Sequence, residues 1–199
     1  VVETELKTKT FRRFSAQTGK QMIIQAIRTA ERENQTRAYE EKREEIVTAL
    51  VDKVDDTDGS VILDTGTSRA VLPRSEQIPG ERFTVGDRVK VYISEVKSEA
   101  YGPIVTLSRV HPGLVKRLFE LEIPEIQDGT VVIRSIAREA GSRTKIAVES
   151  RDPDVEAVGA LIGAKNTRKN SVMKELRGEK IDIINWSEKP AELVKSALS

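Results

Sequence analysis

The sequence predicts a multidomain chain with α+β and all-β parts: an N-terminal helix, a five-stranded β-barrel and an α+β domain. Apolar residues first recur at helical spacing, then alternate with a period of two between residues 46 and 110, and afterwards follow a mixed pattern. A change of hydrophobic period marks a change of element type. We therefore divide the chain into residues 1–43, 44–110 and 111–199.

Composition limits the classes of protein that fit. The 33 lysines and arginines are offset by 32 aspartates and glutamates, so any basic surface has to be local. Cysteine is absent, which excludes disulfides and thiolate zinc sites and is consistent with a reducing compartment. Without a membrane-length apolar run or a signal-peptide pattern, we expect a cytoplasmic protein with no membrane partner. Because the chain starts at Val1 instead of methionine, we also expect a fragment of a longer protein.

The first periodic segment covers about residues 14–47. Met22, Ile23, Ile27 and Ala30 have helical spacing and predict one buried stripe. The second half, ERENQTRAYEEKREE, is almost wholly polar, as in helices that bridge domains. We expect a helical lever between upstream and downstream parts, and a charged linker without fixed structure is the alternative.

Five short strands are predicted next. They are Ile46–Val54, Val61–Leu63, Arg69–Leu72, Asp87–Val96 and Ile104–Val110. Turn-forming residues separate most of them, and one long excursion, Pro73–Gly86, separates the third from the fourth. Five short strands with a long third connection predict a small closed barrel of the OB type.

The pattern changes again after His111-Pro112-Gly113. The expected helices are Leu114–Leu121, Val155–Leu161 and Ala191–Leu198, and the expected strands are Gly129–Arg138, Arg143–Glu149 and Lys180–Trp186. These strands predict a three-stranded sheet with helices packed on one face.

A candidate phosphate-binding turn lies in the segment VGALIGAKNTRKNSVMKELR, residues 158–177. Two helical stretches flank the small-residue turn Gly163-Ala164-Lys165-Asn166, and Arg168 and Lys169 follow in the first turn of the second helix. Backbone N–H groups at a helix start attract phosphate, and glycine permits close approach. The alternative is a helix-turn-helix segment with charged solvent-exposed faces.

Several stretches resemble known families. IVTALVDKV, SVILDTG, RAVLPRSEQIPGERFTVGDRVKVYISEV and VTLSR are similar to an S1 domain. PRSEQIPGERFTVGDRV together with VTLSRVHPGLVKRLFELEIPEI resembles the NusA family of bacterial transcription factors, and FSAQTGKQMIIQAIRTAERE resembles the helix that ends its amino-terminal domain. The order of elements after residue 111 resembles a type II KH domain.

The KH resemblance implies that a GxxG loop grips RNA. The matching tetrad is Gly163-Ala164-Lys165-Asn166, with asparagine in place of the second glycine. Asparagine tolerates positive φ and caps helices well, although its side chain crowds an approaching phosphate. We expect Lys165, Arg168 and Lys169 to contact phosphates, with Arg168 and Lys169 facing outward.

The barrel lacks one feature common among S1 domains, the strand aromatics that stack bases. SVILDTGTSRAVL contains none, and we expect Phe83, Tyr92 and Tyr101 to be packing or rim residues. Basic residues would instead follow an RNA backbone, so we expect the barrel alone to bind RNA weakly. These residues are Arg69, Arg74, Arg82, Arg88 and Lys97.

Signals for catalysis, metals and cofactors are thin, and we predict none of the three. His111 is the single histidine, and we expect it to be a linker residue. The acidic cluster from Asp52 to Asp58 lacks calcium-loop spacing. Trp186 is expected to pack rather than to stack on a base, and neither a P-loop nor a dinucleotide fingerprint occurs.

The NusA resemblance implies a non-enzymatic RNA-binding elongation factor that modulates pausing, termination and antitermination. The implied partners are nascent RNA, bacterial RNA polymerase and other antitermination factors, with the protein acting as a monomer. The alternative is an S1/KH portion of an RNA-degrading enzyme, but in polynucleotide phosphorylase the KH module precedes the S1 domain, whereas the barrel comes first here. A ribosome-associated binder is a third possibility.

Overall fold

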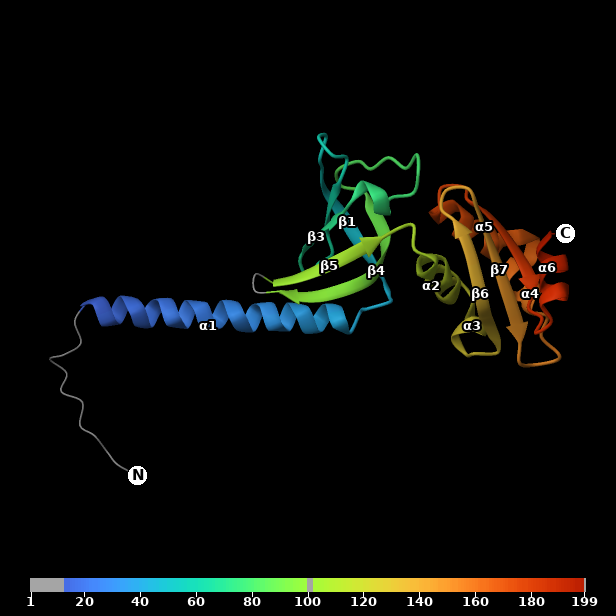
Figure 1. The fold of residues 1–199 in the computed structure, drawn as a ribbon, viewed down its shortest axis with the longest axis horizontal. Coiled ribbons are helices and arrows are strands. Elements are labelled where there is room, and N and C mark those ends of the chain that lie inside the picture. The colour runs from blue at the N-terminus through green and yellow to red at the C-terminus, as the bar shows by residue number, and fades with distance from the viewer. Residues whose placement is uncertain (1–12, 100–101, 199) are drawn as a thin grey trace, which may run out of the picture.

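The computed structural model describes residues 13–99 and 102–198 and shows three successive parts (Figure 1). Helix α1 (Arg13–Glu40) extends away from a small barrel, and an α/β unit follows on the other side of the barrel. The predicted order of helix, barrel and α+β domain is therefore confirmed. Tyr101 and residues 1–12 lie outside the described part of the chain.

Helix α1 differs from its prediction in what it buries. Met22, Ile23 and Ile27 are 68%, 63% and 53% exposed, so the expected stripe is not buried by the part of the chain that the structure describes. The polar second half instead carries the anchor. Tyr39 is 1% exposed within the barrel core, and its hydroxyl hydrogen-bonds the Ser68 hydroxyl at 2.8 Å. One aromatic residue therefore fixes the end of the helix on the barrel.

The barrel consists of five antiparallel strands in the order β3-β2-β1-β4-β5. Their bounds are β1 Ile46–Val54, β2 Val61–Asp64, β3 Arg69–Leu72, β4 Arg88–Glu99 and β5 Gly102–Ser108. Strands β3 and β5 lie side by side, so the sheet curls into a nearly closed barrel. Buried and more exposed residues alternate along its strands as predicted, and Val61, Leu63 and Leu72 on the inner face are fully buried.

The long excursion between β3 and β4 contains the short helix η2 (Arg74–Glu76) and closes one end of the barrel. Gln77 Nε2 donates to the carbonyl oxygens of Gly59 and Leu72 at 2.9 and 3.1 Å. Phe83 is half-buried against the barrel core, which agrees with its predicted packing role. Ile78 belongs to the core of the following unit instead.

The α/β unit carries a three-stranded sheet in the order β6-β7-β8, with β8 parallel to β7. The strands are β6 Val131–Glu139, β7 Arg143–Ser150 and β8 Lys180–Asn185. The helices are α2 Pro112–Glu122, α3 Pro124–Gln127, α4 Ala157–Ile162, α5 Thr167–Glu175 and α6 Pro190–Leu198, with η3 (Ala164–Asn166) between α4 and α5. Helix α3 was not predicted.

Helices cover both faces of this sheet. Ile146 and Val148 of β7 are fully buried in the core that includes Leu161 of α4 and Val172 of α5. The alternate residue Lys145 points to the other face, where its Nζ donates to the Ala197 carbonyl of α6. The expectation of helices on one face thus holds for α4 and α5, while α6 packs on the opposite side.

A buried arginine joins the barrel to the α/β unit. Arg109, directly after β5, donates from Nε and Nη2 to the two carboxylate oxygens of Glu81, both at 2.8 Å, and from Nη2 to the Glu175 carbonyl of α5 at 3.0 Å. Arg109 and Glu81 side chains are 1% and 0% exposed. Arg177, after α5, donates to the same Glu81 carboxylate at 3.2 Å. Residues from both units therefore share one buried ion network.

The β6–β7 hairpin packs against the segment between β3 and β4, close to this ion network. At Gly141 an added Cβ would lie 3.1 Å from Ile78 Cγ2, so glycine allows the close approach. The buried Glu179 carboxylate anchors the hairpin by accepting from the Gly141 N–H and from Arg138. Burial opposes ionisation of Glu179, but the hydrogen bonds from Arg138, Thr144 and Gly141 outweigh it and lower its pKa.

Candidate nucleic-acid interface

The turn between α4 and α5 has an unusual backbone. Gly163 has φ 69° and ψ 173°, and Lys165 and Asn166 follow in the left-handed region with φ 53° and 62°. Two consecutive non-glycine residues with positive φ are uncommon, and such conformations cluster at functional sites. An added Cβ at Gly163 would also lie 2.8 Å from Arg168 Cγ. Backbone angle and space both require glycine there.

Asn166 accounts for the missing second glycine. The prediction that asparagine keeps the turn geometry is confirmed, because Asn166 adopts the left-handed conformation that glycine would otherwise supply. The expected helix-capping role is wrong, because its side chain makes no capping hydrogen bond to α5. The Thr167 N–H, the first of α5, donates to the Ala164 carbonyl, and no side chain caps the helix start. N–H groups in the first turn of a helix attract phosphate.

The three expected phosphate contacts separate into two kinds. Lys165 is exposed at the tip of the turn, and Lys169 is half-buried beside it. Arg168 does not face outward as predicted. Its Nη1 donates to both Glu125 carboxylate oxygens at 3.0 Å and to the Ala160 carbonyl at 2.8 Å, so it ties α5 to α3 and α4. We assign Arg168 a role in holding the turn rather than in contacting a ligand.

Glu125 is well suited to hold Arg168. The backbone N–H of Glu125, at the start of α3, lowers the pKa of its carboxyl group, and Arg168 lowers it further against the opposing effect of burial. The carboxylate is thus charged at neutral pH and keeps Arg168 in place.

A groove of about 310 Å³ lies next to the turn, between α4, α5 and strand β8. Its apolar lining includes Ile162, Ile181 and Ile183, and Lys169 borders it. Arg143 and Lys145 border it as well, but both pair with Asp182, at 2.5 and 3.5 Å. The arrangement offers an apolar surface for unpaired bases and a lysine for the backbone. Sequence periodicity marked Ile181 and Ile183 only as strand residues and did not single out Ile162.

The basic residues expected on the barrel do not form one track. Cross-strand pairing aligns Arg69, Asp64, Leu50 and Arg88 in one row, with an arginine at each end. Lys97 lies nine residues along β4 from Arg88, roughly 30 Å at the usual rise of a strand. Arg69 and Lys97 form exposed ion pairs with Asp52 and Glu95.

Arg74 lies elsewhere, in η2 beyond the other end of β3. The structure thus places Arg69 and Arg88 on one barrel face and separates Arg74 and Lys97 from them. This division was not visible in the sequence, because it depends on strand register.

The residues considered for catalysis have structural contacts. His111 accepts from the Gly113 N–H through Nδ1 and stacks on Tyr92 with ring centroids 4.7 Å apart. Asp55 and Asp58 accept from backbone N–H groups of their own turn. Within residues 13–99 and 102–198, no cluster of histidine, aspartate and glutamate could hold a metal ion, and no helix could span a membrane.

A five-stranded barrel followed by a KH-type α/β unit defines the chain as a tandem of two domain types that occur in RNA-binding proteins. Residues 109–186 match the family model of the NusA-like first KH domain. The whole chain is 48% and 47% identical to the transcription termination/antitermination protein NusA of Halalkalibacterium halodurans and of Bacillus subtilis, and 40% identical to that of Thermus thermophilus.

These matches cover 100% of this chain and 52%, 53% and 51% of the three relatives. The predicted resemblance to the NusA family is thereby confirmed: the chain corresponds to the region of NusA that carries the barrel and the first KH domain. It spans about half the length of the relatives that it matches.

Proposed function

We propose that this chain is the RNA-binding segment of a non-enzymatic transcription elongation factor that modulates pausing, termination and antitermination. The observation that carries the proposal is the left-handed turn Gly163–Asn166, which places the exposed Lys165 and the start of α5, without a side-chain cap, beside an apolar groove. The relatives are named as termination/antitermination proteins.

In this proposal the turn grips the RNA backbone. Gly163 and Ala164 let the strand approach, Lys165 and Lys169 contact phosphates, and Asn166 holds the turn open. Unpaired bases then lie in the groove over Ile162 and Ile183. Arg69 and Arg88 on one barrel face, and Arg74 and Lys97 at separate positions, add further basic contacts for the RNA backbone.

The proposed partners are nascent RNA, bacterial RNA polymerase and other antitermination factors. In this proposal the protein binds them as a monomer in the cytoplasm. We assign residues 1–43 to the end of a polymerase-binding part, 44–110 to the S1 barrel and 111–199 to the KH domain. The exposed apolar side chains of α1, among them Met22, Ile23 and Ile27, suit contact with protein rather than with RNA.

Salt dependence of RNA binding tests the clamp. Each phosphate contact to single-stranded nucleic acid contributes about 0.7 to the slope of log K against log salt. The double substitution Lys165→Gln and Lys169→Gln should therefore reduce the slope by about 1.4 for an unpaired oligoribonucleotide. Lys42→Gln, which changes an exposed lysine after α1, is the matched control and should leave the slope unchanged.

An unaltered slope in the double variant would refute the clamp assignment. The polymerase part of the proposal is tested separately, by binding the chain to purified core polymerase with and without nascent RNA. Binding in neither case would remove the assignment of polymerase as a partner of this segment.

A further inference from the structure

A second candidate site lies between the barrel and the KH unit, away from the α4–α5 turn. It is a cleft of about 850 Å³ walled by the ends of β1 and β2, by the excursion between β3 and β4, and by Ala140 of the β6–β7 hairpin. Ligand sites of roughly 300–1,000 Å³ are typical for small molecules or single nucleotides. The barrel segment supplies most of the walls, and the KH unit adds one wall at Ala140.

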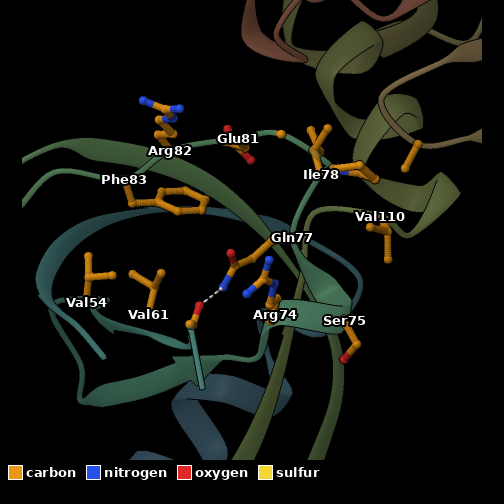
Figure 2. Close-up of a pocket in the computed structure, with 14 residues that line it drawn as sticks. Val54, Val61, Arg74, Ser75, Gln77, Ile78, Glu81, Arg82, Phe83 and Val110 are labelled. Carbon is orange, nitrogen blue, oxygen red and sulfur yellow. Dashed lines mark hydrogen bonds between the residues drawn. The ribbon is translucent and has the colours of Figure 1, made fainter. Parts of the chain in front are cut away.

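The lining combines an aromatic ring with two free arginines (Figure 2). The ring of Phe83 lies over Val54 and Val61, Arg74 lies beside Gln77, and Arg82 projects away from the apolar floor. Within the described residues neither Arg74 nor Arg82 has an ion-pair or hydrogen-bond partner for its guanidinium group. Both guanidinium groups are therefore available to an anion.

The carboxylate that lines this cleft, that of Glu81, is already paired with two arginines. The Glu81 side chain is 0% exposed and already receives hydrogen bonds from Arg109 and Arg177. Its charge therefore does not offset those of Arg74 and Arg82. The same ion network fixes the backbone from which Arg82 and Phe83 project, so the cleft is held in shape before a ligand arrives.

We propose that this cleft receives one unpaired nucleotide of RNA. Its base would lie against Phe83, its phosphate would bind Arg74, and Arg82 at the mouth would bind the neighbouring phosphate. An arginine fork matches the geometry of phosphate oxygens, and any base can stack on an aromatic face. The inference rests on the proposed RNA-binding function and adds a second contact site to it.

The acidic turn Asp55–Gly59 limits the path that the RNA strand can take. Asp55, Asp56 and Asp58 lie beside the β1–β2 edge of the cleft and would repel a polyanion. Apart from the one phosphate bound by Arg74, which lies against Gly59 of this turn, the RNA backbone would therefore stay on the Arg82 side. An acidic peptide would meet the same repulsion and, lacking a base, would have less contact with Phe83.

Fluorine NMR provides a test localised to the cleft. The chain has four phenylalanines, and labelling with 4-fluorophenylalanine makes each visible, with Phe83 assigned by loss of its signal in Phe83→Leu. An unpaired oligoribonucleotide should shift the Phe83 signal and leave Phe119, which is 0% exposed in the KH core, in place. An absent Phe83 shift at saturating RNA overturns the inference, as does a shift produced by poly-glutamate and not by RNA.

Affinity measurements separate this inference from the clamp. Phe83→Leu should weaken RNA binding at least fivefold with an unchanged salt slope, because stacking is lost and no charge is removed. Phe83→Tyr should retain affinity, and thermal unfolding of each variant checks that the barrel is intact. Arg74→Gln should lower the slope by about 0.7, whereas Arg37→Gln on α1, the matched control, should not change it.

Each pattern of results has one meaning. If the clamp variant loses salt dependence while Phe83→Leu and Arg74→Gln bind like the wild type, the cleft inference fails and the proposed function stands. If the wild type does not bind RNA, both fail.

Discussion

Replacing Arg109 by methionine tests the junction between the barrel and the KH unit. The substitution preserves much of the side-chain length but removes both hydrogen bonds to Glu81, at 2.8 Å each, and the bond to the Glu175 carbonyl. Glu81 then remains buried with only Arg177, whose side chain is 56% exposed. Breaking a buried ion pair by removing one partner destabilises a protein by about 3–5 kcal/mol.

The expected loss is large enough to measure by thermal unfolding. For a chain of this size, 1 kcal/mol corresponds to about 2–4 °C in melting temperature, so Arg109→Met should lower it by roughly 6–20 °C. Arg69→Met is the matched control, because Arg69 forms an ion pair with Asp52 at 3.2 Å while 69% exposed. Exposed pairs contribute about 0–1 kcal/mol. A loss in Arg109→Met no larger than in Arg69→Met would refute the assigned role of the buried network.

Two further predictions concern the α4–α5 turn and the KH hairpin. Asn166 has φ 62°, so Asn166→Val should lower the free energy of unfolding by about 1–2 kcal/mol, while Asn166→Gly should not lower it in the same denaturant titration. Glu179 has a lowered pKa in the folded protein. The stability that its carboxylate contributes is therefore fully present above the ordinary pKa of 4.5, and it is lost as the pH falls from there through the lowered pKa. Glu179→Gln should therefore lower the free energy of unfolding by about 3–5 kcal/mol at pH 7. At pH 3.5 the free energies of the variant and the wild type should differ less. An equal difference at both pH values would contradict the role of the buried carboxylate.

Hydrophobic period predicted the strands of the barrel and of the KH unit well, because each of these strands buries one face. The five barrel strands and the three KH strands were found within a few residues, and the alternation at Val61 and Leu63 matches their burial. Residues whose surroundings come from distant segments were not predictable. Tyr39 lies in a polar stretch, and its partner Ser68 is 29 residues away.

The candidate site shows the same division. The turn at Gly163–Asn166 was located from local composition, and the tolerance of Asn166 for positive φ is a property of that residue alone. Whether Arg168 faces solvent depends on Glu125, 43 residues earlier in the chain. The position of Arg168 beside Lys169 in the sequence therefore indicated a basic surface, whereas the contacts of Arg168 show that it holds three helices together.

The excursion between β3 and β4 shows how a segment with weak sequence signals can govern the geometry of the whole chain. Ile78 is buried in the KH core, Glu81 receives arginines from both units, and Phe83 packs on the barrel. These contacts lie within six residues, so the position of the KH unit and the shape of the cleft are set together. An isolated barrel would lack the KH turn, Arg177 and the hairpin wall at Ala140, so one wall of the cleft would be missing. Weak RNA binding by the barrel alone stays a prediction, based on the absence of aromatic residues on β2 and β3 and now also on this shared construction.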